Sequence, residues 1–320
     1  MKKIFIARKA DKAMFKTLID LGYQIDISKN ELTNCDELRG VLKDYDAVIT
    51  TIGCNIDKDI IKEAGKQLKI IATTSVGFDH IDIDACKAKN IYVTNTPGAN
   101  SWCVAEHTVG LILDATHRIS EADRFVRKDA FHGFDFNLFI GDEIKDNIIG
   151  IVGLGNIGKA VAKILINGFG CKVYYYDCKR DEKFEKEYGI TFVPELEDLM
   201  KASDILTIHV PLQNDTKYLI HEYNLNLMKK DAFLINTSRG AVVKEQALID
   251  VLKNNKIRGA AMDVFEDEIN VNKEFMTMDN VVLTPHIAAS SDETHKNMVK
   301  AAMKNVIQAL ENVQPEDLVY

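Results

Sequence analysis

A glycine-rich turn is the clearest chemical signal in the sequence. Gly153, Gly155 and Gly158 follow the apolar run NIIGIV and open the amphipathic stretch KAVAKIL. In a strand–turn–helix unit, such glycines permit the tight turn, let the backbone approach a pyrophosphate, and let the helix pack on the strand. The helix N-terminus then offers unpaired N–H groups to the phosphates. A glycine turn without a ligand is the alternative, but both flanking elements favour a dinucleotide site.

An acid closes the next predicted strand at the position where such a site needs one. Asp177 ends the run KVYYYD, 19 residues after Gly158. A carboxylate at this point hydrogen-bonds the ribose 2′-OH of NAD and repels the 2′-phosphate of NADP. Lys179 and Arg180 follow directly and leave some use of NADP open. The spacing predicts NAD as the cofactor.

Three further side chains follow apolar runs of the kind that form parallel strands. Arg239 follows AFLINTS, Glu268 follows AAMDVFED, and His286 follows VVLTP. Histidine suits proton transfer near neutral pH, a neighbouring glutamate favours its protonated form, and arginine holds a planar carboxylate. Taken singly, Arg239 is interpreted as a cap of its strand, Glu268 as a solvated acid in a loop, and His286 as a histidine in a turn. Together, beside a dinucleotide site, they predict oxidation or reduction of a hydroxy or keto acid.

Two series of strands must position these residues. In the first third of the chain, strands are expected at 3–7, 47–51, 69–73 and 91–95, and helices at 57–67 and 83–89. A second series of nearly continuous apolar runs begins near residue 147, which is typical of parallel strands covered on both faces. The alternation predicts an α/β fold: a Rossmann-type doubly wound parallel sheet and a flavodoxin-like α/β domain.

Two longer helices are expected near the junctions between these domains. The segment 100–118 has buried-helix spacing, and 292–312 follows the last strand of the second series and is able to cross back to the first domain. The expected substrate domain is therefore discontinuous, comprising residues 1–98 and 290–320. The NAD-binding domain spans residues 99–289.

Composition bounds the class of protein. The chain has 320 residues, 46% hydrophobic and 28% charged, with a net charge of −8, which argues against a nucleic-acid surface. No apolar run reaches the roughly 20 residues of a membrane span. The N-terminus reads as a strand and not as a signal peptide. Six scattered cysteines (35, 54, 86, 103, 171 and 178) suggest free thiols, no metal site and a cytoplasmic location.

Several motifs resemble the D-isomer-specific 2-hydroxyacid dehydrogenase family over nearly the whole chain. They are SVGFDHID (75–82), NTPGANSWCVAEHT (95–108), VGLGNIG (152–158), HVP (209–211), NTSRG (236–240), DVFEDE (263–268) and TPHIA (284–288). The resemblance implies that Arg239 binds the substrate carboxylate and that Glu268 pairs with His286, the general acid/base. It also implies D-stereochemistry, a cleft between the domains and a homodimer.

The resemblance assigns further contacts. Backbone N–H groups of Ser75, Val76 and Gly77 are expected to bind the carboxylate. The cofactor is expected to contact residues that follow the strands or face them, with the pyrophosphate beside the glycine turn: Thr108, Asn156, Ile157, His209, Val210, Pro211, Thr237, Ser238 and Asp263.

The substrate is less well defined than the reaction. Thr51 and Thr73 stand where phosphoglycerate-oxidising relatives carry arginines, and Val76 stands where phosphite-oxidising relatives carry lysine. The expected substrate is a small 2-keto acid of the D-lactate or 2-hydroxyisocaproate type. Ala289 and Ser290 after the histidine motif resemble hydroxypyruvate and glyoxylate reductases, which are the alternative, with 3-phosphoglycerate behind them. An NAD-sensing corepressor is the alternative of another class.

Overall fold

The computed structural model describes residues 1–31 and 35–320, and the side chain of Cys35 lies outside that description. The chain forms two compact units, one made of Met1–Asn100 with Ser290–Tyr320 and the other of Ser101–Ala289. The expected junction at residue 98 falls two residues before the end of the first segment.

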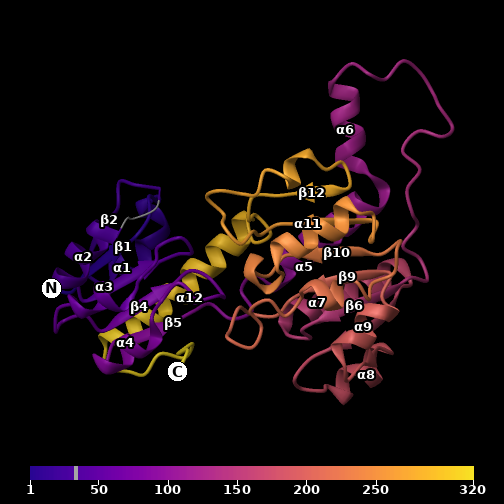
Figure 1. Ribbon diagram of the computed structural model, residues 1–320. Helices are drawn as coiled ribbons and strands as arrows, with labels where there is room; N and C mark the ends of the chain where they lie inside the picture. Colours follow the sequence, from indigo (N-terminus) through magenta and orange to yellow (C-terminus); the bar gives the residue numbers. More distant parts are fainter. Residues whose placement is uncertain (32–34) are drawn as a thin grey trace. The chain divides into compact units, whose positions relative to one another are not determined.

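The first unit contains a five-stranded parallel sheet with strand order β2-β1-β3-β4-β5 (Figure 1). This is the order of a flavodoxin-like sheet, so the predicted class is confirmed. Its strands are β1 (Lys3–Ile6), β2 (Gln24–Ile27), β3 (Ala47–Thr50), β4 (Ile70–Thr73) and β5 (Tyr92–Thr94). Its helices are α1 (Lys16–Asp20), α2 (Cys35–Asp44), α3 (Lys58–Lys62), α4 (Ile83–Ala88) and α12 (Asp292–Leu310).

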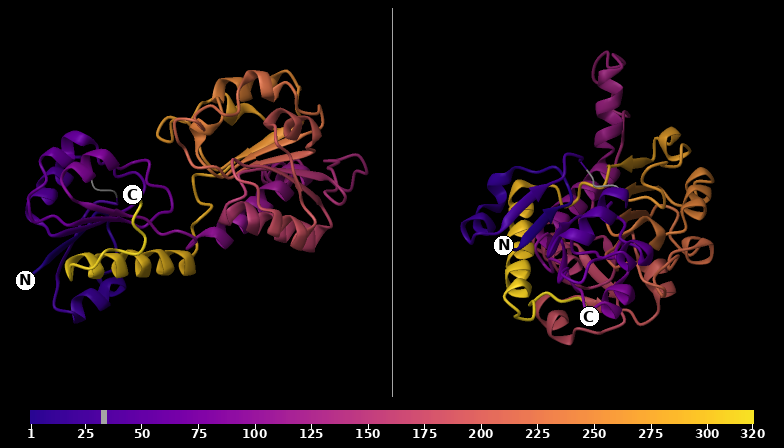
Figure 2. Two further views of the ribbon diagram at one scale, coloured as in Figure 1. Left: turned by 90° about the horizontal axis from the view of Figure 1, so that it is seen from below. Right: turned by 90° about the vertical axis from the view of Figure 1, so that its left-hand side faces the viewer.

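Helix α12 explains why the first unit is discontinuous. One of its faces buries apolar residues, among them Val299, Ala302 and Val306, in the same cluster as Ile49 of β3 and Ile70 of β4. The C-terminal helix therefore covers one face of the first sheet, while α2, α3 and α4 contribute to the cluster on the other. Figure 2 shows α12 in yellow along that sheet.

The second unit contains a seven-stranded parallel sheet of order β12-β11-β10-β9-β6-β7-β8. If the strands are numbered in chain order with β6 as strand 1, the order read from β8 is 3-2-1-4-5-6-7. This is the predicted Rossmann order 3-2-1-4-5-6 with one strand added at the edge. Its strands are β6 (Ile148–Val152), β7 (Lys172–Tyr176), β8 (Thr191–Phe192), β9 (Ile205–Ile208), β10 (Phe233–Asn236), β11 (Gly259–Met262) and β12 (Val281–Leu283). Its helices are α5 (Ser101–His117), α6 (Ile119–Arg127), α7 (Asn156–Phe169), α8 (Glu182–Tyr188), α9 (Leu196–Ala202), α10 (Glu222–Leu225) and α11 (Glu245–Lys253).

Strand β10 shows how the second sheet is buried on both faces. Phe233 and Ile235 point into the cluster formed with α5 and α7, whereas Leu234 points into the cluster formed with α9, α10 and α11. Because successive side chains of a strand alternate between faces, a strand covered on both sides has to be apolar throughout.

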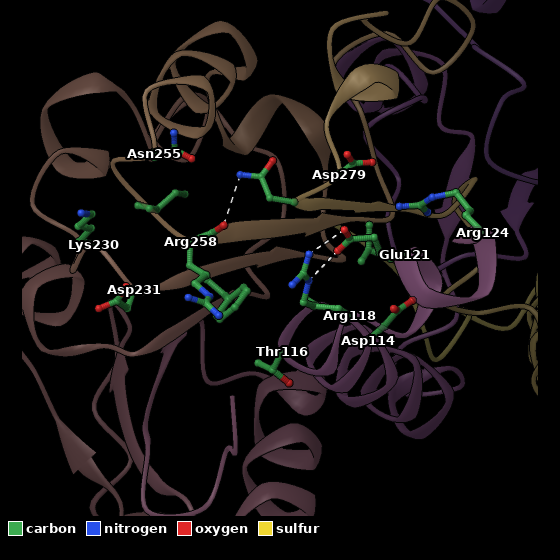
Figure 3. Close-up of a pocket in the computed structure, with 15 residues that line it drawn as sticks. Asp114, Thr116, Arg118, Glu121, Arg124, Lys230, Asp231, Asn255, Arg258 and Asp279 are labelled. Carbon is green, nitrogen blue, oxygen red and sulfur yellow. Dashed lines mark hydrogen bonds and ion pairs between the residues drawn. The ribbon is translucent and has the colours of Figure 1, made fainter. Parts of the chain in front are cut away.

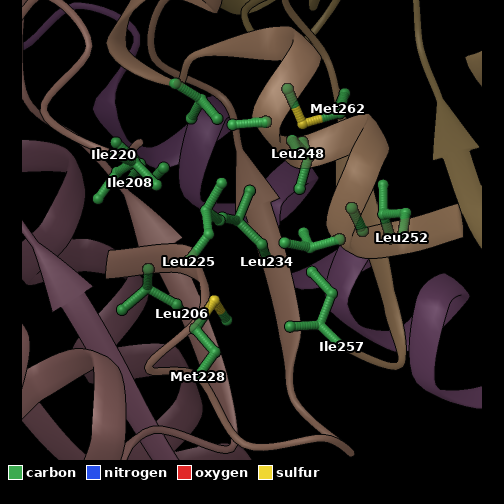
Figure 4. Close-up of a cluster of buried hydrophobic side chains, with 14 of the residues drawn as sticks. Leu206, Ile208, Ile220, Leu225, Met228, Leu234, Leu248, Leu252, Ile257 and Met262 are labelled. Carbon is green, nitrogen blue, oxygen red and sulfur yellow. The ribbon is translucent and has the colours of Figure 1, made fainter. Parts of the chain in front are cut away.

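Leu234 lies at the centre of the second of these clusters and is fully buried (Figure 4). Leu234→Ala removes side-chain volume that the surrounding helices cannot fill completely. We expect it to lower the free energy of unfolding of this unit by about 2–5 kcal/mol. Urea denaturation followed by circular dichroism measures the change, and a loss below about 1 kcal/mol would show that the cluster repacks around the cavity.

The structure corrects several expected boundaries. The helix expected at 57–67 ends at Lys62, because the chain turns there and Gly65 N–H donates to the Leu42 carbonyl. Gly65 packs so closely on Lys43 that a Cβ would lie 2.4 Å from its carbonyl oxygen. The helix expected at 100–118 stops at His117, because Arg118 takes a left-handed conformation (φ 57°) before α6 begins.

Two edge strands were missed. In β2, the sequence QIDI has only one buried residue, Ile25, and β8 is two residues long. Such short, partly polar edges lack the apolar run that marks the central strands.

In the described part of the chain, no helix is long and apolar enough to span a bilayer. Among the described cysteines, Cys54, Cys86, Cys103, Cys171 and Cys178 are free thiols. The side chain of Cys35 lies outside the described residues, so its predicted free state is untested.

Candidate active site

The glycine turn between β6 and α7 has the geometry of a phosphate-binding loop. Gly153 has a φ of +96°, and a Cβ there would lie 2.8 Å from Val210 Cγ1. A Cβ on Gly158 would lie 2.2 Å from the Gly153 carbonyl oxygen, so the helix packs directly on the turn. A Cβ on Gly155, in contrast, would meet nothing within 4 Å. The open backbone at Gly155, at the N-terminus of a 14-residue helix, leaves space for a pyrophosphate.

Asp177 is anchored beside this turn. Its Oδ2 accepts a hydrogen bond from Leu154 N–H at 2.7 Å, and its Oδ1 accepts one from Lys179 N–H at 2.9 Å. These contacts hold the carboxylate at the carboxyl end of β7 with acceptor capacity left for a ribose hydroxyl. The residues therefore fit a dinucleotide with an unmodified 2′-OH.

His209 follows β9, and Val210 and Pro211 come directly after it. The Nε2 of His209 lies 3.0 Å from Thr207 Oγ1, and its Nδ1 is buried without a hydrogen-bond partner among the described residues. Burial lowers the pKa of His209 to about 3, so the ring is neutral at physiological pH. Its backbone forms the wall against which Gly153 packs. His209 thus packs against the glycine turn, and its contact with the cofactor stays a prediction.

The turn after β10 carries Arg239 and is built by one buried amide. Asn236 Oδ1 accepts hydrogen bonds from the N–H and the hydroxyl of Ser238, at 3.0 and 2.8 Å. Its Nδ2 donates to the Arg239 carbonyl at 3.0 Å. A Cβ on Gly240 would collide with the Phe265 backbone, so this turn lies directly against the segment that leads to Glu268. Asn236 was not among the predicted site residues, since an amide that ends a strand gives no chemical signal in sequence.

His286 and Glu268 form a direct pair. His286 Nδ1 lies 2.8 Å from Glu268 Oε1. Since an ionised carboxylate only accepts hydrogen bonds, Nδ1 carries the proton and Nε2 is directed elsewhere. The His286 side chain is 25% exposed and the Glu268 side chain 42%, so the pair is reachable by a small solute.

Asp263 holds the turn that presents His286. Its carboxylate accepts hydrogen bonds from Ile287 N–H and Ala288 N–H, both at 2.9 Å, and from Thr284 Oγ1 at 2.6 Å. His286 N–H donates to the Asp263 carbonyl at 2.8 Å, and His286 takes a φ of 54°. Burial alone would raise the pKa of Asp263, but hydrogen bonds from His107, Thr284 and the two backbone N–H groups lower it below its ordinary value.

Replacing Asp263 tests this anchor. Asp263→Asn removes the charge and one acceptor, so we expect a loss of about 2–4 kcal/mol in the free energy of unfolding at pH 7. Because the folded-state pKa is depressed, the wild-type advantage is full above the unfolded pKa of about 4 and is lost as pH falls through the folded value. Urea titrations from pH 7 to pH 3 should show a constant difference that shrinks below about pH 4. A difference independent of pH would contradict the charge-based account.

Ser75, Val76 and Gly77 lie in the first unit, in a loop after β4. Ser75 Oγ donates to the Gly77 carbonyl at 2.6 Å, and Asn95 Nδ2 donates to the Val76 carbonyl at 2.7 Å. These bonds use carbonyl groups, and no contact in the described part of the chain uses the N–H groups of Val76 and Gly77. That this loop binds a carboxylate remains a prediction of the resemblance.

A hollow of about 370 Å³ lies at the opposite edge of the second sheet, near the amino ends of β10, β11 and β12 (Figure 3). Its lining carries as many acidic as basic side chains: Arg118 pairs with Glu121 in a bidentate contact, and Arg258 Nη2 lies 3.1 Å from Asp142 Oδ2. Since ligands of open α/β sheets bind at the carboxyl ends of the strands, this hollow is not the active site. Within the described residues, no group of acidic, histidine or cysteine side chains is arranged to hold a metal ion.

Comparison with known proteins identifies the family. A model described as "D-isomer specific 2-hydroxyacid dehydrogenase, NAD binding domain" matches residues 109–288, more than half of the chain. The chain belongs to this family. It is therefore an NAD-dependent oxidoreductase that acts on the CH–OH group of its donor, as the motifs predicted.

Relatives of this family member are similar over nearly their whole length. Glyoxylate reductases of Thermococcus litoralis and Thermofilum pendens are each 41% identical; the first alignment covers 99% of this chain and 96% of the relative, and the second 99% and 94%. Among solved structures, D-lactate dehydrogenase from Aquifex aeolicus, complexed with NAD and lactic acid, is 30% identical with a TM-score of 0.86, covering 97% of this chain and 96% of that one.

Proposed function

We propose that this family member reduces glyoxylate or hydroxypyruvate with NADH, forming glycolate or D-glycerate. The His286–Glu268 pair at 2.8 Å carries the reaction class, because it supplies an oriented proton donor in the same unit as the glycine turn. The substrate follows from the relatives: two proteins that share 41% of its residues are named glyoxylate reductase. Ala289 and Ser290 after the histidine motif agree with that choice.

The side chains of the site have complementary tasks. Arg239 binds the carboxylate of the keto acid through its planar guanidinium and so orients the carbonyl. His286 hydrogen-bonds the carbonyl oxygen through Nε2–H and transfers that proton to it, and Glu268 stabilises the imidazolium before the transfer. Bound NADH supplies the hydride that forms the new C–H bond at C2. One proton and one hydride thus convert the carbonyl to a secondary alcohol, or to a primary alcohol for glyoxylate.

Pyruvate is the second candidate, and the neighbouring D-lactate dehydrogenase structure favours it. The decisive experiment follows NADH absorbance at 340 nm with glyoxylate, hydroxypyruvate, pyruvate and 2-ketoisocaproate. We expect kcat/KM to be at least tenfold higher for glyoxylate or hydroxypyruvate than for pyruvate. The reverse order would assign the D-lactate type, and tight NADH binding without turnover of any acid would contradict both.

A phosphorylated substrate is disfavoured by the first unit. Thr73 stands where phosphoglycerate-oxidising relatives carry an arginine. It is fully buried, and its Oγ1 lies 2.7 Å from Ser75 Oγ. The hydroxyl is therefore used inside the loop. With NAD⁺ in place of NADH, we expect 3-phosphoglycerate to be oxidised at a negligible rate, seen as no formation of NADH.

The preference for NAD over NADP has a second support besides Asp177. Arg180, the nearest arginine, forms a bidentate ion pair with Glu185, at 2.9 and 2.8 Å, and its guanidinium lies 5.6 Å from the centre of the Phe192 ring. Tyr175 OH also donates to Glu185 at 2.8 Å and holds the acid in place. We infer that Glu185 withholds Arg180 from a 2′-phosphate.

A pair of substitutions tests this inference. Asp177→Ser removes the repulsion and should raise kcat/KM for NADPH, and adding Glu185→Gln should raise it about tenfold further, since a charge-assisted hydrogen bond contributes about 1.5–3 kcal/mol. Glu182→Gln is the matched control. Glu182 lies on the same helix, but its carboxylate is 4.0 Å from the Arg180 guanidinium, too far for a hydrogen bond. Equal effects of the two glutamate variants would contradict the role of Glu185.

We further propose that the protein forms a homodimer through α6 and the segment after it. No residue of α6 is buried, and Figure 1 shows the helix projecting from the second unit. Val126, Phe134 and Phe136 are 56%, 89% and 82% exposed. Phe139 packs against Phe125 of α6 with ring centres 5.2 Å apart, so helix and segment form one apolar arm. Large exposed apolar patches mark interfaces in soluble proteins.

Light scattering tests the dimer. The wild-type chain should have twice the mass of one chain, and Phe134→Asp with Phe136→Asp should yield monomers. Met276→Asp, which changes an equally apolar residue that is 63% exposed elsewhere on this unit, serves as the control. A monomeric wild-type protein, or a dimer that persists in the double variant, would refute the proposed interface.

A further inference from the structure

Two consecutive residues of helix α5 contact the two turns of the active site. His107 Nε2 lies 3.2 Å from Thr284 Oγ1 and 3.5 Å from Asp263 Oδ1, beside the turn that carries His286. Thr108 Oγ1 lies 2.9 Å from Thr237 Oγ1, in the turn that carries Arg239. Helix α5 thus joins both turns, and its 17 residues pack against β10, β11 and β12.

The proton on His107 can be assigned from its neighbours. The Asp263 carboxylate, whose pKa is lowered by its hydrogen bonds, is ionised at neutral pH and only accepts. Thr284 Oγ1 lies 2.6 Å from it and therefore donates its single proton to it. The oxygen of Thr284 has only lone pairs left for His107, so His107 Nε2 must carry a hydrogen. This holds for the Nε2–H tautomer of the neutral ring as well as for the imidazolium.

The same reasoning orders the hydrogen bonds at Thr108. Its hydroxyl donates to the Val104 carbonyl at 2.7 Å, so Thr237 has to donate to Thr108. Each end of the site is thereby joined to α5 by a hydrogen bond with a defined direction. Neither bond reverses without breaking a second one.

The contact of His107 controls groups that the catalytic turn depends on. Thr284 and Asp263 fix the backbone from His286 to Ala288, and His286 holds its left-handed φ of 54° within that turn. A residue other than glycine adopts such a φ only where the surrounding hydrogen bonds enforce it. Without the N–H of His107, the Thr284 hydroxyl oxygen no longer accepts a hydrogen bond. The carboxylate of Asp263, which is fully buried, then has one hydrogen-bond donor fewer around it.

We propose that His107 is a positioning residue for the reaction, acting as a fixed hydrogen-bond donor that holds the Asp263–Thr284 pair and through it the imidazole of His286. The proposal rests on the proposed role of His286 as the proton donor. His107 itself transfers no proton. Its side chain is 22% exposed, so a substitution there does not open a cavity in the core.

Three variants separate donation from bulk. His107→Leu removes the donor, and we expect kcat to fall about 10- to 100-fold, the range produced when reacting groups are displaced by about 1 Å. His107→Gln supplies an N–H in a similar place and should retain at least a third of wild-type kcat with the wild-type pH profile. Thr284→Val should resemble His107→Leu. His117→Gln, an exposed histidine of the same helix, is the control and should match the wild type.

Outcomes of these assays either support or overturn the proposal. Rescue by glutamine, with the dissociation constant for NADH and the melting temperature of all variants near wild type, supports it. Wild-type kcat in His107→Leu, equal loss in the leucine and glutamine variants, or a shifted pH profile in His107→Gln would each overturn it.

A measurement without turnover keeps the proposal testable if a variant does not fold or if the role of His286 fails. Long-range ¹H–¹⁵N NMR spectra of the wild-type protein should show a protonated Nε2 for His107, identified by the missing signal in His107→Gln. A His107 ring protonated only at Nδ1 would refute the assignment whatever the kinetics show. A correct His107 tautomer with full activity in His286→Ala would instead locate the failure in the proposed function.

Discussion

His286→Ala is expected to lower kcat/KM for keto-acid reduction by about 10²- to 10⁴-fold, the range that general acid catalysis contributes. The geometry orients this imidazole as a proton donor, with Nδ1 held by Glu268 at 2.8 Å and Nε2 directed away from that carboxylate. Its removal leaves the carbonyl oxygen to take a proton from water. Stopped-flow and steady-state measurements of NADH oxidation check this effect.

Two controls make that result specific. The dissociation constant for NADH, measured by fluorescence, should change less than threefold, since the glycine turn and Asp177 lie at other strand ends. Glu268→Gln should cause a smaller loss, because glutamine hydrogen-bonds the ring but does not stabilise the charge of the imidazolium. A His286→Ala enzyme within fivefold of wild type would remove this residue from the reaction.

Arg239→Leu is expected to lower kcat/KM by about 10²- to 10⁴-fold. Two charge-assisted hydrogen bonds to a carboxylate contribute about 1.5–3 kcal/mol each, and each 1.36 kcal/mol corresponds to tenfold in rate. The turn is set by Asn236 and Gly240, so its backbone should survive the substitution.

Arg239→Lys refines this test. Lysine keeps the charge but presents no planar fork, so we expect it to recover only part of the loss, mainly in KM. Arg124→Leu, which changes an exposed arginine of α6, is the matched control and should leave kcat/KM unchanged. If Arg239→Lys were as active as wild type, bidentate binding of the carboxylate would be disproved.

Much of this site was predictable because it depends on residue type and order. The glycines, Asp177 and the three side chains proposed to act on the substrate follow apolar runs, and parallel strands bring such ends to one edge. The sheet order of the second unit confirms the fold that this pattern required. The central strands were found because a sheet covered on both faces needs unbroken apolar runs.

The missed features depend on contacts between distant residues. His107 lies 177 positions before Thr284, and its helical spacing marked it only as part of a buried face. Asn236 and Thr284 act through hydrogen bonds to backbone and side chains that no local pattern reveals. The edge strand β2 was missed because its partly polar sequence has no strand pattern of its own. It forms a strand by pairing in parallel with β1.

The fate of a labelled hydride tests most directly whether this protein reduces 2-keto acids with His286 as the proton donor. NADH with deuterium at both positions of nicotinamide C4 is incubated with hydroxypyruvate, glyoxylate and pyruvate in separate reactions, and the products are analysed by mass spectrometry and chiral chromatography. We expect D-glycerate or D-lactate carrying one deuterium at C2, or glycolate with the same label, and loss of this product in His286→Ala. Products without deuterium, L-isomers, or labelled product formed equally fast by His286→Ala would contradict it.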